Sequence, residues 1–164
     1  MAIKDAFMAE LKHESALTKK ILERVPLDKK EWKPHERSMT LGRLATHIAQ
    51  TPHWISDIYH IDDFDFATRS FQPIVAASSD ELMKIFQDTL DTALADLEKM
   101  SDEDFSKKWI VRVGDKVMYD TPKKVAMRGW AYSHLIHHRG QLSVYLRLLD
   151  VPVPGMYGPS ADER

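Results

Sequence analysis

Four separate stretches of this chain of 164 residues repeat apolar side chains every three to four positions. This spacing places the apolar side chains on one face of an α-helix, where they can be buried together. The helices are expected at residues 5–24, 40–61, 78–100 and 121–150. Because short links join them, we expect an all-α fold, a four-helix bundle, formed by one domain that spans residues 1–164.

Local signals refine these limits. Ser78, followed by Glu81 three residues later, fits a capping box, so the third helix should begin there. Pro52 lies inside the second helical stretch and predicts a kink or break near Gln50, because proline cannot donate a backbone hydrogen bond. Residues 62–73 lack periodicity and are expected to form a loop.

A short segment before the last helix has the period of a β-strand instead. Apolar and polar residues alternate over 109–113, and the alternation resumes at 117–119. Gly114 and Asp115 between them suit a two-residue turn. We therefore expect a small β-hairpin, which must pack on the helices because an isolated hairpin is barely stable.

Composition and charge exclude several classes of protein. The hydrophobic content of 43%, the charged content of 29% and the net charge of −2 are ordinary for a globular protein and give no basic footprint for nucleic acid. No apolar run is long enough for a transmembrane helix, and residues 1–10 do not read as a signal peptide, so we expect a cytoplasmic protein. With no cysteine, a metal would need histidine or carboxylate ligands.

Two histidines, His134 and His138, lie one turn apart on the last expected helix. On a wheel with about 100° per residue they share an arc with apolar residues, whereas Arg139 falls on the polar side. Imidazoles that point inward need partners for both ring nitrogens. They either form a hydrogen-bonded core network or share a metal ion.

The best candidate for a third ligand is His47, which lies beside Ile48 on the apolar stripe of the second helix. Glu14 lies near the inward stripe of the first helix, where it could face the metal or hold a water molecule as a catalytic base, or could simply be solvated. Trp54 and Trp130 are expected in the core. The remaining histidines are expected outside the ligand set: His13, His35, His53, His60 and His137.

Three segments together resemble the DinB/YfiT-like superfamily, small damage-inducible bacterial proteins that are distinct from the DNA polymerase of similar name. They are TLGRLATH at 40–47, HLIHHRGQLSVYLR at 134–147 and PGMYGPSADE at 154–163. The segment WKPH at 32–35 also resembles one branch of the superfamily. The similarity spans nearly the whole chain, and the HHRGQ block is its most specific part.

The resemblance implies a homodimeric four-helix bundle with a divalent metal, zinc or nickel, held by His47, His134 and His138. Some relatives are thiol S-transferases, and one is a maleylpyruvate isomerase. We therefore expect a metal-dependent transferase or hydrolase that acts on a small molecule, with a low-molecular-weight thiol as co-substrate and neither nucleic acid nor membrane as partner. The alternatives are a non-catalytic metal-binding stress-response protein and a bundle whose histidines are only hydrogen-bonded.

Overall fold

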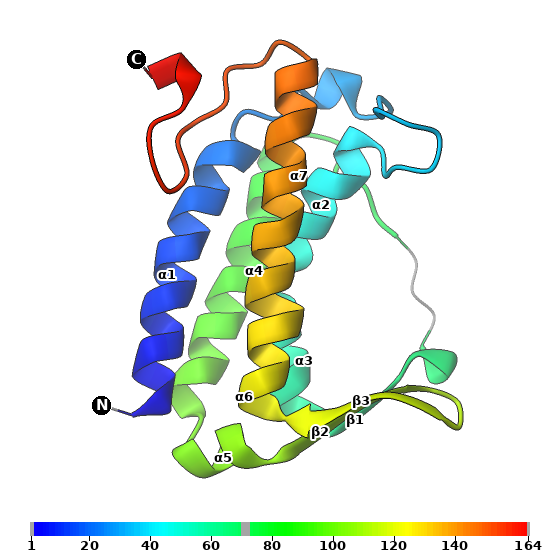
Figure 1. Cartoon of the computed structure of the whole chain (residues 1–164), viewed down its shortest axis with the longest axis vertical. Coiled ribbons are helices and arrows are strands. Elements are labelled where there is room, and N and C mark those ends of the chain that lie inside the picture. Colours follow the sequence, from blue (N-terminus) through cyan, green and yellow to red (C-terminus); the bar gives the residue numbers. More distant parts are fainter. Residues whose placement is uncertain (1, 70–72, 164) are drawn as a thin grey trace.

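Helices running along the longest dimension dominate the computed structural model, which describes residues 2–69 and 73–163 (Figure 1). The main helices are α1 (Ile3–Leu22), α2 (Leu41–Gln50), α3 (His53–His60), α4 (Ser79–Lys99) and α7 (His134–Leu148). Shorter helical turns are η1 (Leu27–Lys29), η2 (Phe66–Thr68), α5 (Asp102–Ser106), α6 (Lys123–Ala126) and η4 (Ala161–Glu163). Helix α4 packs against α1, α2 and α3, while α7 packs against α1 and α2. The mostly helical fold is thus confirmed, and a small three-stranded sheet is added to it.

The break predicted at Pro52 is present. Helix α2 ends at Gln50, and α3 begins at His53. Thr51 and Pro52 between them keep right-handed helical dihedral angles, so the chain bends without forming a loop. As a result α2 packs on α7, whereas α3 packs on the segment that precedes α7.

The start of α4 is also as predicted. The Ser78 hydroxyl accepts a hydrogen bond of 3.1 Å from the backbone N–H of Glu81. The Glu81 carboxylate accepts one of 2.7 Å from the N–H of Ala77, one residue before the position that a capping box uses. Both hydrogen bonds satisfy backbone donors at the helix entrance.

The predicted hairpin forms two strands of the sheet, β2 (Lys108–Val113) and β3 (Lys116–Pro122), which pair antiparallel. Gly114 in the turn has a φ of 59°, a left-handed conformation that glycine adopts without steric cost. The pairing register shifts between Val111 and Arg112, because Met118 is an extra, unpaired residue in β3 at that point.

The expectation of a loop at 62–73 is wrong for part of that stretch, and residues 70–72 lie outside the described residues. Strand β1 (Asp63–Asp65) pairs parallel with β2. The Arg112 side chain donates hydrogen bonds of 2.7 Å to both Asp63 and Asp65 and ties the two strands together. A strand whose partner lies more than forty residues later leaves no local periodicity to detect.

The helix expected at 121–150 forms as one continuous helical run from α6 to α7, but it contains a π-helical segment at Met127–Ser133. A π-helical turn holds more residues than an α-helical turn, and such turns are frequent at functional sites. The segment therefore changes which face of the helix each later residue occupies. His134, the first residue of α7, follows it directly.

Two groups of buried apolar side chains fill the interior. One includes Ile48 of α2 and Leu135 of α7, and the other includes Ile55 of α3 and Ala131 of the π-helical segment. Between α2 and α3 the buried side chains change from the first group to the second close to His47. Between the π-helical segment and α7 they change from the second group to the first close to His134. No helix in the described part of the chain is long and apolar enough to cross a membrane.

Replacing Ser78 by alanine tests the cap of α4. Ser78→Ala removes the acceptor for the Glu81 N–H and is expected to lower the free energy of unfolding by about 1 kcal/mol. Ser79→Ala, at the neighbouring exposed position inside the helix, is the control and should change it by much less. Urea unfolding followed by circular dichroism measures both, and equal losses would contradict the capping role.

Candidate metal centre

Three histidine rings from two helices converge at the middle of the molecule. The Nε2 atoms of His47 and His134 are 2.8 Å apart. The ring centroid of His138 lies 4.6 Å from that of His47 and 4.5 Å from that of His134. In the described part of the chain these are the one group of three or more potential ligand residues whose ligand atoms all lie within 4.8 Å of one another. The structure thus brings together the three residues that the sequence singled out.

Neighbouring helices position the three rings. His47 lies in the last turn of α2, and His134 and His138 lie one turn apart at the start of α7, which packs on α2. All three are half-buried, so they lie at the edge of the core. The helical wheel had placed His134 and His138 among the inward-facing apolar residues. The wheel assumed α-helical geometry throughout, whereas the π-helical segment shifts the apolar residues before His134 relative to those after it.

A neighbouring side chain orients His138. Its Nδ1 lies 2.7 Å from Oε1 of Gln141, an oxygen that can only accept a hydrogen bond. The imidazole must therefore carry its proton on Nδ1, and the lone pair of Nε2 is left for another partner. A hydrogen bond of this kind to the second nitrogen is the usual companion of a metal-binding histidine.

The environment keeps the rings uncharged. Burial, and secondarily the positive charge that His138 and His134 would carry, lowers the pKa of His47 to about 3. Burial and neighbouring histidines lower the pKa of His134 to about 4, and burial lowers the pKa of His138 as well. At neutral pH the three rings are therefore neutral, the form that binds metal ions. The donor set and its protonation state fit a divalent cation.

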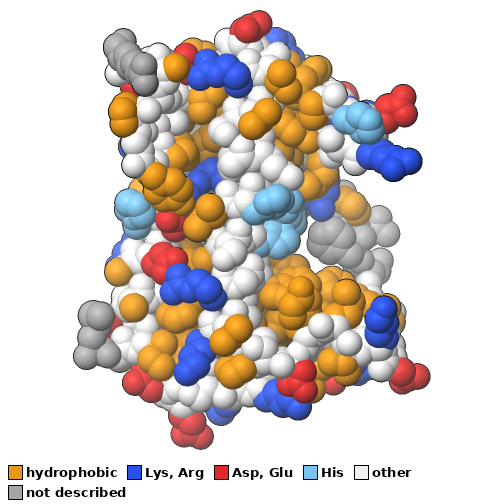
Figure 2. Space-filling model, viewed as in Figure 1, with side chains coloured by type: hydrophobic (Ala, Val, Ile, Leu, Met, Phe, Trp, Pro, Cys, Tyr) orange, Lys and Arg blue, Asp and Glu red, His pale blue; other side chains and the backbone are white. Residues whose placement is uncertain are grey.

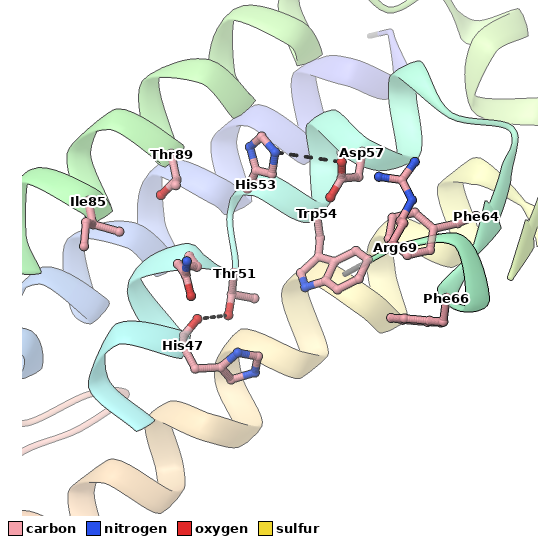
Figure 3. A pocket seen from close by; sticks show the side chains of 11 residues that line it. His47, Thr51, His53, Trp54, Asp57, Phe64, Phe66, Arg69, Ile85 and Thr89 are labelled. Carbon is pink, nitrogen blue, oxygen red and sulfur yellow. Dashed lines mark hydrogen bonds and ion pairs between the residues drawn. The ribbon is translucent and has the colours of Figure 1, made fainter. Parts of the chain in front are cut away.

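A cavity of about 490 Å³ lies beside His47 (Figure 3). Aromatic rings form one wall, among them Trp54 and Phe66, and the charged side chains of Asp57 and Arg69 lie away from His47. Burial raises the pKa of Asp57, although nearby cationic groups oppose the shift. The cavity therefore combines an apolar wall, two opposite charges and a potential metal ligand.

A second cavity, of about 440 Å³, lies beside His134. Its lining includes Tyr119, Trp130 and Gly129, and it has no charged residue. Figure 2 shows histidine side chains at the centre of this face of the molecule, directly above a cluster of hydrophobic side chains. Each cavity thus borders one member of the histidine group, His47 for the first and His134 for the second.

The two tryptophans expected in the core lie at these cavities instead. Trp54 and Trp130 are half-buried, their ring centroids are 5.3 Å apart, and each lines one cavity. The ring of Tyr119 meets Trp130 edge-on at 5.4 Å, which connects the sheet to the site. Their apolar character alone could not distinguish a core position from a cavity wall.

Glu14 and Arg139 form a buried ion pair, which the sequence reading missed. The Arg139 side chain is 2% exposed and that of Glu14 is 7% exposed, so the expectations of a polar-face Arg139 and a solvated Glu14 are both wrong. The structure gives the Glu14 carboxylate two partners, Arg139 and Tyr157. A catalytic role for Glu14 stays a prediction. The one sequence signal for the pair was the place of Glu14 beside the apolar stripe of α1.

The other histidines lie outside the group. His13, His35, His53, His60 and His137 are all exposed. His53 lines the first cavity, where its Nε2 lies 3.8 Å from an Asp57 oxygen, and His60 pairs with Asp96 at 3.1 Å. The solvent-exposed positions predicted for His13, His53 and His60 are confirmed.

Comparison with known proteins agrees with this arrangement. The model of the DinB family matches residues 1–164. The chain belongs to the DinB family. Among solved structures, a DinB-like protein from Bacillus cereus matches with a TM-score of 0.71 and 20% identity, over 95% of this chain and 98% of that one. A DinB-like protein from Bacillus subtilis matches with a TM-score of 0.67 and 18% identity, over 96% and 97%. At these identities both DinB-like structures show the fold alone, and no curated protein matches significantly.

The low pKa values of the histidine group predict how the stability of this DinB protein depends on pH. Below pH 6.5 the unfolded chain binds protons at His47 and His134 that the folded chain does not, because their folded pKa values are about 3 and about 4. The free energy of unfolding of the metal-free protein should therefore rise as the pH is raised from about 5 to 6.5. Urea unfolding in the presence of a chelator measures this rise.

The matched variants are His47→Gln, which should flatten the dependence, and His13→Gln, which removes an exposed histidine and should leave it unchanged. An equal dependence in all three proteins would show that the histidine group is not its source.

Proposed function

We propose that this DinB protein binds one divalent metal ion, zinc or nickel, through His47, His134 and His138, and uses it for transferase or hydrolase chemistry on a small molecule. The observation that carries the proposal is the convergence of three neutral imidazoles, two of which line neighbouring cavities. A network serving stability alone would need neither the cavities nor an uncharged ring set at the surface of the core.

Three protein ligands leave a coordination position open, as in catalytic zinc sites, whereas structural sites use four. A bound ion would supply Lewis acidity, which lowers the pKa of a water or thiol placed at the open position. A low-molecular-weight thiol fits this proposal as co-substrate, because an ion at the open position could bind its sulfur as thiolate, and no cysteine of the chain would be needed. Gln141 would keep the His138 ring in its ligating orientation.

The cavities suggest how substrates would be held. In the first, Asp57 and Arg69 can orient a polar or charged group while Trp54 supports the apolar part. In the second, Trp130 and Tyr119 offer apolar contact and exclude water beside His134. A site in which two distinct cavities each reach one ligand of the same ion suits a transfer between two molecules.

The remaining parts of the proposal follow from the family resemblance. We include a homodimer, a cytoplasmic location and a four-helix bundle in which α2 and α3 together count as one bent helix beside α1, α4 and α7. The packing of α4 on α1, α2 and α3 supports this description of the fold. Light scattering would test the homodimer, and cell fractionation would test the cytoplasmic location.

Metal analysis of the untagged protein tests the metal site. Inductively coupled plasma mass spectrometry should find about one zinc or nickel ion per chain, and His138→Ala should lose it because two imidazoles bind far more weakly than three. His13→Ala, which removes an exposed histidine on another helix, is the control and should keep the ion.

No bound metal, with no thermal stabilisation on adding zinc or nickel, would contradict the metal site. Bound metal without turnover on any pair of thiol and electrophile would instead support the non-catalytic alternative.

Filling the second cavity tests its role in binding. Gly129 lines this cavity, and a Cβ atom added there would meet no atom within 4 Å, so we expect the ring of Gly129→Phe to extend into the space. The uncharged fluorescent probe N-phenyl-1-naphthylamine should bind the unchanged protein and lose this binding in the variant. Metal content should be unchanged.

Gly140→Phe is the matched control. Gly140 lies on the same helical run and is also exposed, with no atom within 4 Å of the added carbon, yet it lines neither cavity. Both substitutions replace a glycine in a helix and so carry the same gain in helix propensity. Equal probe binding by the two variants would rule out the second cavity as an apolar binding site.

A further inference from the structure

Arg139 follows His138 in α7 and points its guanidinium into the protein toward α1. One nitrogen donates to the Glu14 backbone carbonyl at 2.9 Å and to the Thr18 hydroxyl at 3.1 Å. The other donates to the Glu14 carboxylate. The Thr18 hydroxyl donates in turn to the Glu14 carbonyl at 2.8 Å, so one turn of α1 supplies three acceptors for the guanidinium.

The C-terminal segment 151–163 reaches the same ion pair. The Tyr157 hydroxyl donates to the Glu14 carboxylate at 2.8 Å and accepts a hydrogen bond from Arg139. Tyr157 as a residue is 64% exposed, and its hydroxyl is the part that joins the cluster. A second anchor is Asp162, which accepts hydrogen bonds from the Arg147 guanidinium and from the Val153 N–H.

A guanidinium cannot lose its charge in a protein, so burying it requires a fixed partner. If α7 turned about its axis, Arg139 would leave Glu14 and remain buried without a counter-charge. The ion pair therefore fixes the rotation of α7. His138 is the adjacent residue and His134 lies one turn before it, so the same rotation decides whether both rings face His47.

We propose that Glu14, Arg139 and Tyr157 form a positioning unit for the metal ligands, and that docking of segment 151–163 is coupled to metal binding. The inference rests on the metal site of the proposed function. If the docked segment raises the affinity for the ion, the ion must favour docking of the segment by the same factor. The three residues position the ligands through α7 and do not touch the ion.

The test compares two tyrosine substitutions. Tyr157→Phe removes only the hydroxyl that joins the cluster, and the exposed ring can stay in place. Tyr145→Phe is the control, because its hydroxyl lies on α7 and donates at 3.2 Å to the Met39 carbonyl, away from the ion pair. We expect Tyr157→Phe to weaken zinc binding about tenfold relative to the control, the range seen when a residue that orients a ligand is lost.

Zinc affinity is measured by competition with a chromophoric chelator. The visible spectrum of the cobalt(II)-loaded protein gives a second readout, since its d–d bands report coordination geometry. We expect the bands to change in Tyr157→Phe and to stay unchanged in Tyr145→Phe. A purely structural role would lower the melting temperature of the metal-free variant without altering either readout.

Hydrogen exchange tests the reverse direction. The N–H group of Val153 donates to Asp162, whose carboxylate also accepts from Arg147 of α7, so its exchange reports docking of segment 151–163 at that anchor. Zinc should slow this exchange in the unchanged protein, and the slowing should be lost in Tyr157→Phe. Equal zinc affinities of Tyr157→Phe and Tyr145→Phe, together with hydrogen exchange that zinc does not affect, would overturn the coupling. The proposed metal site would still stand.

Failure of the unchanged protein to bind zinc or cobalt would overturn the proposed metal site and this inference with it.

Discussion

Burying the positive charge of Arg139 constrains the rest of the molecule. The Arg139 side chain is 2% exposed, and its guanidinium donates hydrogen bonds to Glu14, Thr18 and the hydroxyl of Tyr157. These partners belong to the first helix and to the C-terminal segment, so a single side chain of α7 joins three distant parts of the chain. Apolar packing holds helices together but tolerates small rotations, whereas a buried ion pair with several hydrogen bonds does not.

Features that depend on a few consecutive residues could be predicted from the sequence. The cap at Ser78, the bend at Pro52 and the turn at Gly114 each follow from the chemistry of one residue and its near neighbours. The histidine group could be predicted because His134 and His138 lie one turn apart and His47 lies beside an apolar stripe, and the resemblance pointed to the same three residues. From the sequence it was therefore possible to predict the helices that carry the site, α2 and α7, and its three candidate ligands.

The features that were missed depend on distant partners or on irregular geometry. Arg139 looked like a solvated residue because its counter-charge lies 125 positions earlier, and strand β1 pairs with residues 47 positions later. The π-helical segment has no distinctive composition, yet it invalidates a wheel drawn through it. The cavity walls were missed for a related reason: Trp54 and Trp130 meet because α3 packs on the distant π-helical segment, and the sheet adds the ring of Tyr119 beside Trp130.

The π-helical segment at Met127–Ser133 lies between the sheet and the histidine group along the chain. Inserting or deleting one residue in it would therefore rotate the sheet relative to the histidines. Deleting one residue there would restore an ordinary helix and turn everything before it by about 100° relative to everything after it. The hairpin, with its cavity wall, would then face away from His134, although both parts could still fold. Insertion and loss of a single codon would thus offer evolution a way to exchange substrate specificity while leaving the ion-binding residues of the DinB scaffold intact.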